Sequence, residues 1–288
     1  MLDRRLALIL GAASLASPAL AQAPPRLVFT AIPDQDETRL MERFRRVVAY
    51  LEVALGVPVQ YVPVKNYAAA VTAFTNNQVQ LAWFGGLTSA QARRAVPGSE
   101  AIVQGAEDAQ FFSYFIANAS TGLTRSESFP AGIAGRSFSF GSRASTSGRV
   151  MPETFIRQHF NRAPDQVFSR VGFSGDHSRT LQVVQSGAFE VGALDFTVFD
   201  LERQQGRVDD ARVRVIWQTP RFPNYNWTIR GDVDGRFGAG FKERVRAALL
   251  AINDPAILNV FPRERFIPAA NSDYAPMEAA ARALGVLD

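Results

Sequence analysis

The chain has 288 residues, of which 47% are hydrophobic and 20% are charged, and its formal net charge is +4. This length and balance are typical of a soluble globular protein with a sizeable core and room for two domains. Cysteine is absent, which excludes disulfides, thiolate zinc sites and cysteine nucleophiles. No dense run of lysine and arginine follows the pattern of a phosphate-backbone contact, so no nucleic-acid partner is expected.

The first residues have the pattern of a cleaved secretory signal. Residues 1–5 include three charged side chains, residues 6–20 form an apolar run, and small-x-small cleavage sites follow it. The run is too short and too rich in alanine and serine for a good membrane span. We therefore expect residues 1–23 to be a signal peptide that directs export of the chain by the general or the twin-arginine route. An exported chain without cysteine fits a bacterial periplasm.

Predicted strands and helices alternate over the first third of the chain. Apolar runs predict strands over residues 26–33, 57–63 and 79–84, and helical spacing predicts helices over 34–55, 66–74 and 87–95. This alternation is typical of a parallel sheet with helices on both faces.

The alternation of strands and helices is interrupted by a long aromatic strand, which is predicted over residues 110–119. Residues 219–227 are rich in proline and polar aromatic side chains, as in a connection between domains. Beyond the aromatic strand, the predicted strands cover 138–140, 167–173, 189–194 and 213–218, and the predicted helices cover 176–186, 196–205, 240–252, 255–260 and 272–287.

We therefore expect an α/β fold of two lobes, each a mostly parallel sheet flanked by helices, with the second lobe inserted in the first. The expected first lobe comprises residues 24–119 and 224–288, and the second comprises residues 120–223. The two crossing segments that form the hinge are expected near residues 118–122 and 219–227.

The stretch from Phe138 to Glu153 reads as a strand, a loop of small residues and the N-terminus of a helix. Ser145, Thr146 and Ser147 crowd that N-terminus. A helix N-terminus exposes unpaired N–H groups and the positive end of the helix dipole, which suits an anion. Serine and threonine are also ordinary N-cap residues, so a capped helix without a ligand is the alternative.

Unusual residues follow several other predicted strands. In open α/β sheets, ligands bind beyond the carboxyl ends of the strands, where loops and helix N-termini converge. Taken singly, each residue has an ordinary explanation as a surface, core or capping side chain, but their coincidence favours a binding site. The residues are Tyr67, Trp83, Phe84, His177 with its neighbour Asp176, and Asp195.

Signals for catalysis are poor. The chain lacks the nucleophile motif Gly-x-Ser-x-Gly, the phosphate-binding loop, the dinucleotide fingerprint and the zinc motif His-Glu-x-x-His. Its two histidines, His159 and His177, do not make a convincing metal site, so no metal or cofactor is expected. A periplasmic hydrolase that uses serine and His177 stays open as an alternative.

The chain resembles the type II periplasmic solute-binding proteins, and particular stretches are similar to the phosphonate- and phosphite-binding branch that serves ABC importers. The resemblance covers nearly the whole mature chain and is most specific at the Ser-Thr-Ser-Gly segment. The stretches stand in the family's order and cover residues 83–88, 141–148, 175–180 and 186–193.

The resemblance implies a monomer whose two lobes close over a small oxyanion and deliver it to a membrane permease. It implies that Ser145, Thr146 and Ser147 donate hydrogen bonds to the ligand. Tyr67 and the strand end at Trp83–Phe84 add contacts from the other lobe. His177 donates to the oxyanion, and an acidic residue, placed at Asp195 with Asp176 as the alternative, accepts from a protonated ligand oxygen.

Two departures from the family pattern leave the identity of the oxyanion open. Asp176-His177-Ser178 stands where Ser-His-Asp is common, and residues 220–227 replace the usual acidic crossing. Phosphonate, phosphite, phosphate, selenate and sulfate remain candidate ligands. A role in ligand sensing rather than import also stays open. Since a fully ionised sulfate or selenate offers only acceptors, a carboxylate in the pocket would favour a protonated phosphorus oxyanion.

Overall fold

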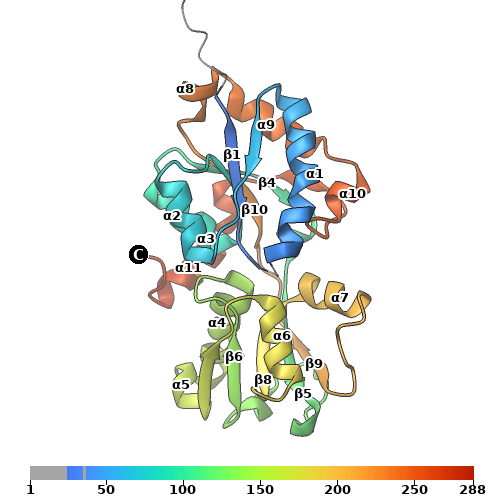
Figure 1. The fold of residues 1–288 in the computed structure, drawn as a ribbon. Helices are drawn as coiled ribbons and strands as arrows, with labels where there is room; N and C mark the ends of the chain where they lie inside the picture. Colours follow the sequence, from blue (N-terminus) through green and yellow to red (C-terminus); the bar gives the residue numbers. More distant parts are fainter. Residues whose placement is uncertain (1–24, 35–36) are drawn as a thin grey trace, which may run out of the picture.

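Two β-sheets, one in each of two lobes, organise the structure (Figure 1). The computed structural model describes residues 25–34 and 37–288, and the side chains of residues 37–40 are not described. The predicted signal peptide, residues 1–23, lies outside these ranges. Among the described helices, none is long and apolar enough to cross a membrane.

The first sheet has six strands in the order β11-β4-β10-β3-β1-β2. Strand β1 pairs in parallel with β2 and β3, and β10 lies antiparallel between β3 and β4. The strands are β1 (Leu27–Ala31), β2 (Val59–Tyr61), β3 (Leu81–Phe84), β4 (Glu100–Gly105), β10 (Asn226–Ile229) and β11 (Phe266–Pro268). The helices of this lobe are α1 (Glu37–Leu55), α2 (Tyr67–Thr75), α3 (Gly86–Ala95), α8 (Val233–Phe237), α9 (Phe241–Leu250), α10 (Pro255–Leu258) and α11 (Ala275–Ala283).

The second sheet has five strands in the order β7-β6-β8-β5-β9. Strand β6 pairs in parallel with β7 and β8, and β5 lies antiparallel between β8 and β9. The strands are β5 (Ser113–Asn118), β6 (Ser137–Phe140), β7 (Arg170–Phe173), β8 (Val191–Asp195) and β9 (Val213–Gln218). The helices of this lobe are α4 (Met151–Phe160), α5 (Pro164–Val167), α6 (His177–Gln185) and α7 (Phe196–Gln204). A π-helical turn (Thr146–Val150) leads into α4, and short 3-10 turns cover Glu107–Gln110, Ala119–Thr121, Ala131–Ile133 and Asn271–Tyr274.

The two-lobe α/β prediction is confirmed, with two differences in detail. Both sheets are mixed, because β10 and β11 in the first and β5 in the second run against their neighbours. The predicted boundary after residue 119 also does not match the pairing of β5, which belongs to the second sheet. The chain therefore crosses between the lobes before β5 rather than near residues 118–122. A buried apolar strand looks the same in either sheet, so its sequence does not reveal its partners.

The two crossing segments pair with each other. The Phe111 backbone N–H donates to the Phe222 carbonyl at 3.0 Å, and the Phe222 N–H donates to the Phe111 carbonyl at 2.8 Å. The second crossing thus lies within the predicted residues 219–227. Beside the crossings, the ring of Trp83 stacks on that of Tyr225, with centroids 5.5 Å apart. Aromatic packing therefore surrounds the hinge on the side of the first lobe.

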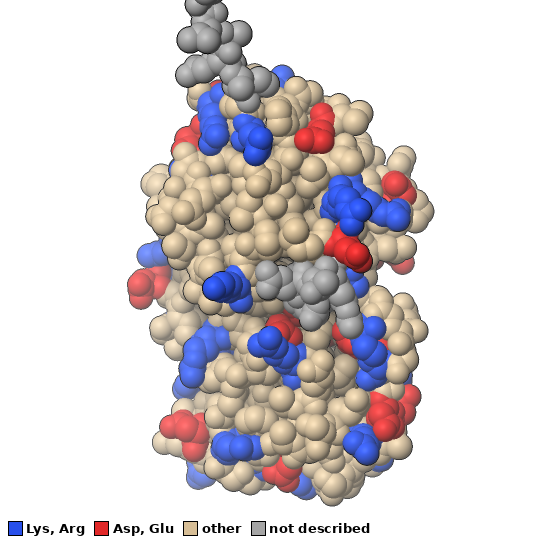
Figure 2. Space-filling view, in the orientation of Figure 1, with Lys and Arg blue, Asp and Glu red and all other residues tan. Residues whose placement is uncertain are grey.

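The lobes are in contact in this structure. Val150 and Met151, which begin the helical segment after the Ser-Thr-Ser turn, pack against the core of the first lobe. Helix α11 of the first lobe contacts α4 of the second across the seam (Figure 1). Figure 2 shows basic side chains on both sides of the seam on the displayed face, interspersed with acidic ones. The structure is therefore a closed arrangement of the two lobes.

Candidate functional site

The Ser-Thr-Ser turn, residues 145–147, is tightly packed at the start of the helical segment. Ser145 caps it, because its Oγ accepts from the Gly148 N–H at 2.9 Å. The side chains of Ser145, Thr146 and Ser147 are all buried. A Cβ on Gly148 would lie 2.9 Å from Cε1 of His177. Glycine at this position therefore lets the turn approach the histidine.

Thr146 joins the two lobes directly. Its Oγ1 accepts from the backbone N–H of Leu87, in the first turn of α3, at 2.8 Å. A Cβ on Gly86 would lie 3.4 Å from this oxygen and 2.9 Å from Cε of Met277. The turn therefore faces a second helix N-terminus in the opposite lobe, and both N-termini favour negative charge between them.

His177 begins α6 and is fully buried. Its Nδ1 accepts from the Asp195 backbone N–H at 3.3 Å, and its Nε2 has no hydrogen-bond partner among the described residues. Burial lowers the pKa of His177, while nearby Asp195 and Asp176 oppose this shift. An imidazole that accepts at Nδ1 carries its proton at Nε2. His177 therefore presents a neutral N–H donor.

Asp195 ends β8, caps α7 and is fully buried. Its Oδ1 accepts from the Thr197 N–H at 2.6 Å, the Thr197 hydroxyl at 2.8 Å and the Val198 N–H at 3.3 Å. Its Oδ2 has no partner in the described parts of the chain. One carboxylate oxygen is thus fixed by the helix and the other is left as an acceptor.

The alternative acceptor, Asp176, is engaged within its own helix. Its Oδ1 accepts from the Arg179 backbone N–H at 2.8 Å, and its Oδ2 lies 3.2 Å from Nε of Arg179. Asp176 thus has an ordinary capping role. Of the two candidate carboxylates, Asp195 is the one with a free oxygen.

The predicted aromatic residues of the first lobe occupy different places. Tyr67 begins α2, and its buried hydroxyl lies near that of Ser145 without a hydrogen bond of ordinary geometry. Burial raises the pKa of Tyr67 well above its ordinary value, so the phenol is a neutral donor. Trp83 lines a cavity beside the site. The structure places Phe84 in the core against Phe74, because successive residues of a strand point to opposite faces.

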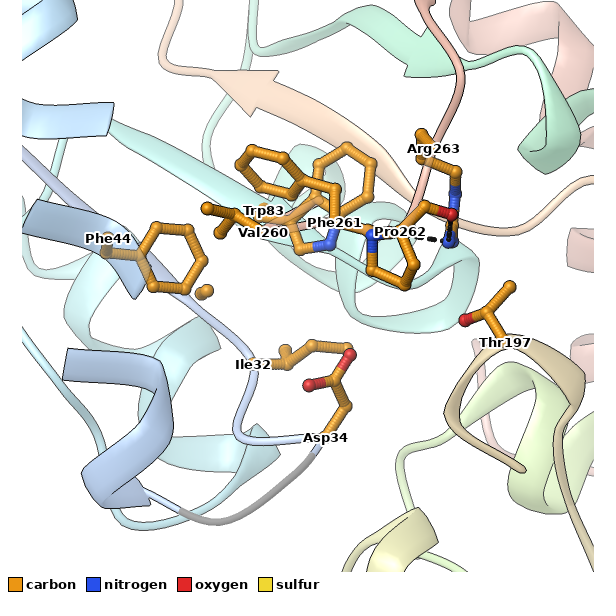
Figure 3. A pocket seen from close by; sticks show the side chains of 10 residues that line it. Ile32, Asp34, Phe44, Trp83, Thr197, Val260, Phe261, Pro262 and Arg263 are labelled. Carbon is orange, nitrogen blue, oxygen red and sulfur yellow. Dashed lines mark hydrogen bonds between the residues drawn. The ribbon is translucent and has the colours of Figure 1, made fainter. Parts of the chain in front are cut away.

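Two further residues at the site were missed by the sequence analysis. Asn224, in the second crossing, is buried with its Nδ2 unpartnered among the described residues. Its Oδ1 accepts from the Gly86 N–H at 3.5 Å. Asp34 follows β1 and lines a cavity of about 10 Å³ between the lobes. Figure 3 shows Asp34 and Thr197 facing this cavity from opposite lobes. An acidic residue three positions after the end of a buried strand was the available signal for Asp34.

Residues 29–274 match the family described as "ABC transporter, phosphonate, periplasmic substrate-binding protein". The chain belongs to this family. It is therefore the periplasmic substrate-binding component of an ABC transporter and not an enzyme, so the hydrolase alternative is not favoured.

Individual relatives agree with this assignment. The chain is 36% identical over 268 residues to the "Probable ABC transporter phosphite binding protein PhnD1" of Prochlorococcus marinus (strain MIT 9301), covering 91% of this chain and 90% of that protein. The structure of that PhnD1 in complex with methylphosphonate superimposes with a TM-score of 0.86 and covers 91% of this chain and 99% of the other. A binding protein component of an ABC phosphonate transporter from Pseudomonas aeruginosa is 20% identical to this chain. Its structure has a TM-score of 0.76 and covers 89% of this chain and 85% of the other, so the two proteins share the same fold.

Proposed function

We propose that this protein captures a small protonated phosphorus oxyanion, a phosphonate or phosphite, between its lobes and delivers it to a membrane permease. The observation that carries the proposal is a set of buried polar atoms without partners among the described residues. Buried polar groups normally have partners, so this set fits a polar ligand. The atoms are the Tyr67 hydroxyl, Nε2 of His177, Oδ2 of Asp195 and Nδ2 of Asn224.

The chemistry of these atoms supports a phosphorus oxyanion over sulfate or selenate. Tyr67, His177 and Asn224 donate hydrogen bonds, as do the hydroxyls and N–H groups of the Ser-Thr-Ser turn. Asp195 only accepts, so it suits a ligand that keeps one O–H. A fully ionised sulfate would leave this carboxylate facing an anion without a hydrogen between them. The complex of the PhnD1 relative with methylphosphonate supports the same ligand class.

The closed arrangement accounts for affinity and delivery in this proposal. Each charge-assisted hydrogen bond contributes about 1.5–3 kcal/mol in a water-poor cleft. Four or five of them would give about micromolar binding or better after the cost of association. The crossing segments, residues 106–112 and 219–225, would act as the hinge, and closure would create the surface that the permease recognises.

The remaining expectations belong to the same proposal. Residues 1–23 serve as a cleaved signal peptide, and the mature protein acts as a monomer. The first lobe comprises residues 24–105 and 226–288, and the second comprises residues 113–218. An importer role is preferred to a sensing role because the matching family and the PhnD1 relative are described as transporter components.

A thermal-shift screen tests the ligand class. Ligand at about 100 times its Kd stabilises the folded state by about 2.7 kcal/mol. We expect methylphosphonate and phosphite to raise the melting temperature more than sulfate, selenate or small carboxylates. A larger shift with sulfate or selenate would contradict the proposed role of Asp195. An ester turnover assay on the same samples is expected to show no hydrolysis.

The Thr146→Val variant tests the contact between the lobes. Valine has nearly the same shape but removes the hydroxyl that accepts from the Leu87 N–H, so we expect methylphosphonate affinity to fall about two- to tenfold. Thr154→Val is a matched control, because the Thr154 hydroxyl donates to the Val150 carbonyl within the same helical segment. Calorimetric titration of both variants measures the effect. Equal affinities in the two variants would contradict the role of Thr146.

A further inference from the structure

Ser113 connects the hinge region to the Ser-Thr-Ser turn. It is the first residue of β5, directly after the first crossing segment, and it is fully buried. Its Oγ donates to the backbone carbonyl of Ser147 at 2.7 Å. A serine beside the hinge is therefore bonded through its side chain to the turn that the proposed function assigns to the ligand.

The peptide group between Ser147 and Gly148 is held at both of its ends. Its carbonyl accepts from the Ser113 hydroxyl, and its N–H, on Gly148, donates to Oγ of Ser145 at 2.9 Å. A peptide group is planar, so a hydrogen bond at each end fixes its orientation. This orientation sets the path of the chain at the start of the helical segment, where backbone N–H groups have no helical partners. The two serines therefore determine how the donors of the turn are aimed at an anion.

The backbone of Ser113 is fixed in turn by the second crossing segment. The Ser113 N–H donates to Oγ1 of Thr219 at 2.9 Å, and the Thr219 N–H donates to the Ser113 carbonyl at 3.0 Å. Thr219 is buried as well, so water does not compete for these groups. The N–H, the carbonyl and the hydroxyl of Ser113 thus all have partners, and its side chain is held in one position.

Ser113 also lies opposite the proposed acceptor of the ligand proton. In the antiparallel pairing of β5 with β8, Ser113 is the partner of Asp195. Residues directly opposite each other in such a pair project from the same face of the sheet, with Cβ atoms about 4.5–5.5 Å apart. The Ser113 hydroxyl therefore holds the turn on the face from which the Asp195 carboxylate projects.

The bond from Ser113 to the turn lies within the second lobe. The bond from the Leu87 N–H to Oγ1 of Thr146, in contrast, joins the two lobes. Opening of the lobes would break the bond to Leu87 and would leave the Ser113–Ser147 bond in place. The turn would then keep its orientation before the ligand arrives, and donors that are already ordered avoid an ordering cost on binding.

We propose that Ser113 is a positioning residue for oxyanion capture, whose hydroxyl orients the peptide group between Ser147 and Gly148 and so preorganises the Ser-Thr-Ser turn relative to Asp195. This inference rests on the proposed function, which assigns the turn and Asp195 to the ligand. Ser113 acts through the turn. Loss of its hydroxyl leaves the buried Ser147 carbonyl without its donor, and the peptide group then turns away from its native orientation to find another.

The Ser113→Ala variant tests this role by calorimetric titration with methylphosphonate and with phosphite. We expect both affinities to fall about three- to thirtyfold, because misplaced donors make weaker hydrogen bonds to the ligand oxygens. Both ligands present phosphorus-bound oxygens to the turn, so we expect the ratio of their affinities to stay within about twofold of wild type. This common loss distinguishes Ser113 from Asp195, whose substitution changes the preference between ligands.

The Ser113→Thr variant tests whether the hydroxyl itself is responsible. Threonine keeps the hydroxyl donor and is well suited to a strand. We expect it to recover most of the affinity that Ser113→Ala loses. A threonine variant that melts like wild type and yet binds as weakly as Ser113→Ala would overturn the positioning role.

The matched control is Ser139→Ala. Ser139 is also fully buried in the second sheet, and its hydroxyl donates to the backbone carbonyl of Phe140, within its own strand, at 3.0 Å. Both alanine variants are expected to lower the melting temperature of the ligand-free protein, whereas Ser113→Ala alone is expected to lose affinity. If the affinities of the two variants agree within about twofold, the positioning role is overturned, whatever their melting temperatures.

A failure of the proposed ligand class gives a different result. If wild type binds neither methylphosphonate nor phosphite, the ligand assignment is wrong, and the ligand-free protein decides the role of Ser113. Hydrogen exchange of the Gly148 amide, followed by NMR, reports the order of the peptide group because this N–H donates to Ser145. We expect exchange at least about tenfold faster in Ser113→Ala than in wild type or Ser139→Ala. Equal Gly148 exchange in all three proteins would overturn the positioning role irrespective of the ligand.

Discussion

Replacing Arg263 with methionine is expected to lower the free energy of unfolding by about 3–5 kcal/mol, because it leaves the carboxylate of Asp108 buried without its partner. Both side chains are almost fully buried, at 2% and 0% exposure, and two hydrogen bonds of 2.7 Å join them. The Arg263 guanidinium also lies over the Phe111 and Tyr225 rings beside the hinge. Equilibrium unfolding in urea measures the change.

Two controls identify the cause of this loss. Arg246→Met removes a partly exposed arginine that lies 3.7 Å from Glu243, and surface pairs of this kind contribute about 0–1 kcal/mol. Adding Asp108→Leu to Arg263→Met removes the unpaired charge, so we expect the double variant to regain part of the stability. A double variant less stable than the single one would show that packing or the Gly105 contact dominates instead.

The Asp195→Asn variant is expected to bind methylphosphonate about 10- to 100-fold more weakly, since a hydrogen bond to a charged group contributes about 1.5–3 kcal/mol. Asparagine keeps the cap of α7, because its amide oxygen can accept from Thr197 and Val198. The change therefore acts mainly on the free oxygen, which becomes an N–H donor. Sulfate, which offers only acceptors, is expected to lose less affinity or to gain some.

Calorimetric titration with methylphosphonate and sulfate measures this change in preference. The same substitution at Asp176 separates the two candidate acceptors, because the Asp176 carboxylate already binds Arg179. We expect a change of less than about threefold for Asp176→Asn. A larger loss in Asp176→Asn than in Asp195→Asn would assign the acceptor to Asp176.

The site residues that the sequence analysis predicted lie just beyond the ends of strands. Ser145, His177 and Asp195 each start or cap a helix directly after a strand, so local order along the chain placed them correctly relative to their own sheet. Sheet topology then brings such positions to one edge. Tyr67 follows the same rule in the other lobe. The roles assigned to these residues remain predictions.

The parts that sequence did not predict depend on contacts between distant segments. Whether β5 joins the first or the second sheet is decided by pairing with β8 and β9, which its own apolar pattern does not encode. Asp34 and Asn224 lie at the site because closure and the second crossing bring them there. Phe84 faces the core because neighbouring side chains of a strand point to opposite faces of the sheet. Both faces of β3 are apolar, so the sequence did not show which of its side chains faces the site.

The paired backbones of Phe111 and Phe222 have a mechanical consequence. The two reciprocal hydrogen bonds of this isolated bridge join the crossing segments at one point, so one segment cannot slide along the other without breaking both bonds. If the lobes close as proposed, this connection would limit sliding between them and favour a bending motion. Such a motion would bring Thr146 back to the same position opposite the Leu87 N–H, so the binding geometry would be reproduced without a search over orientations.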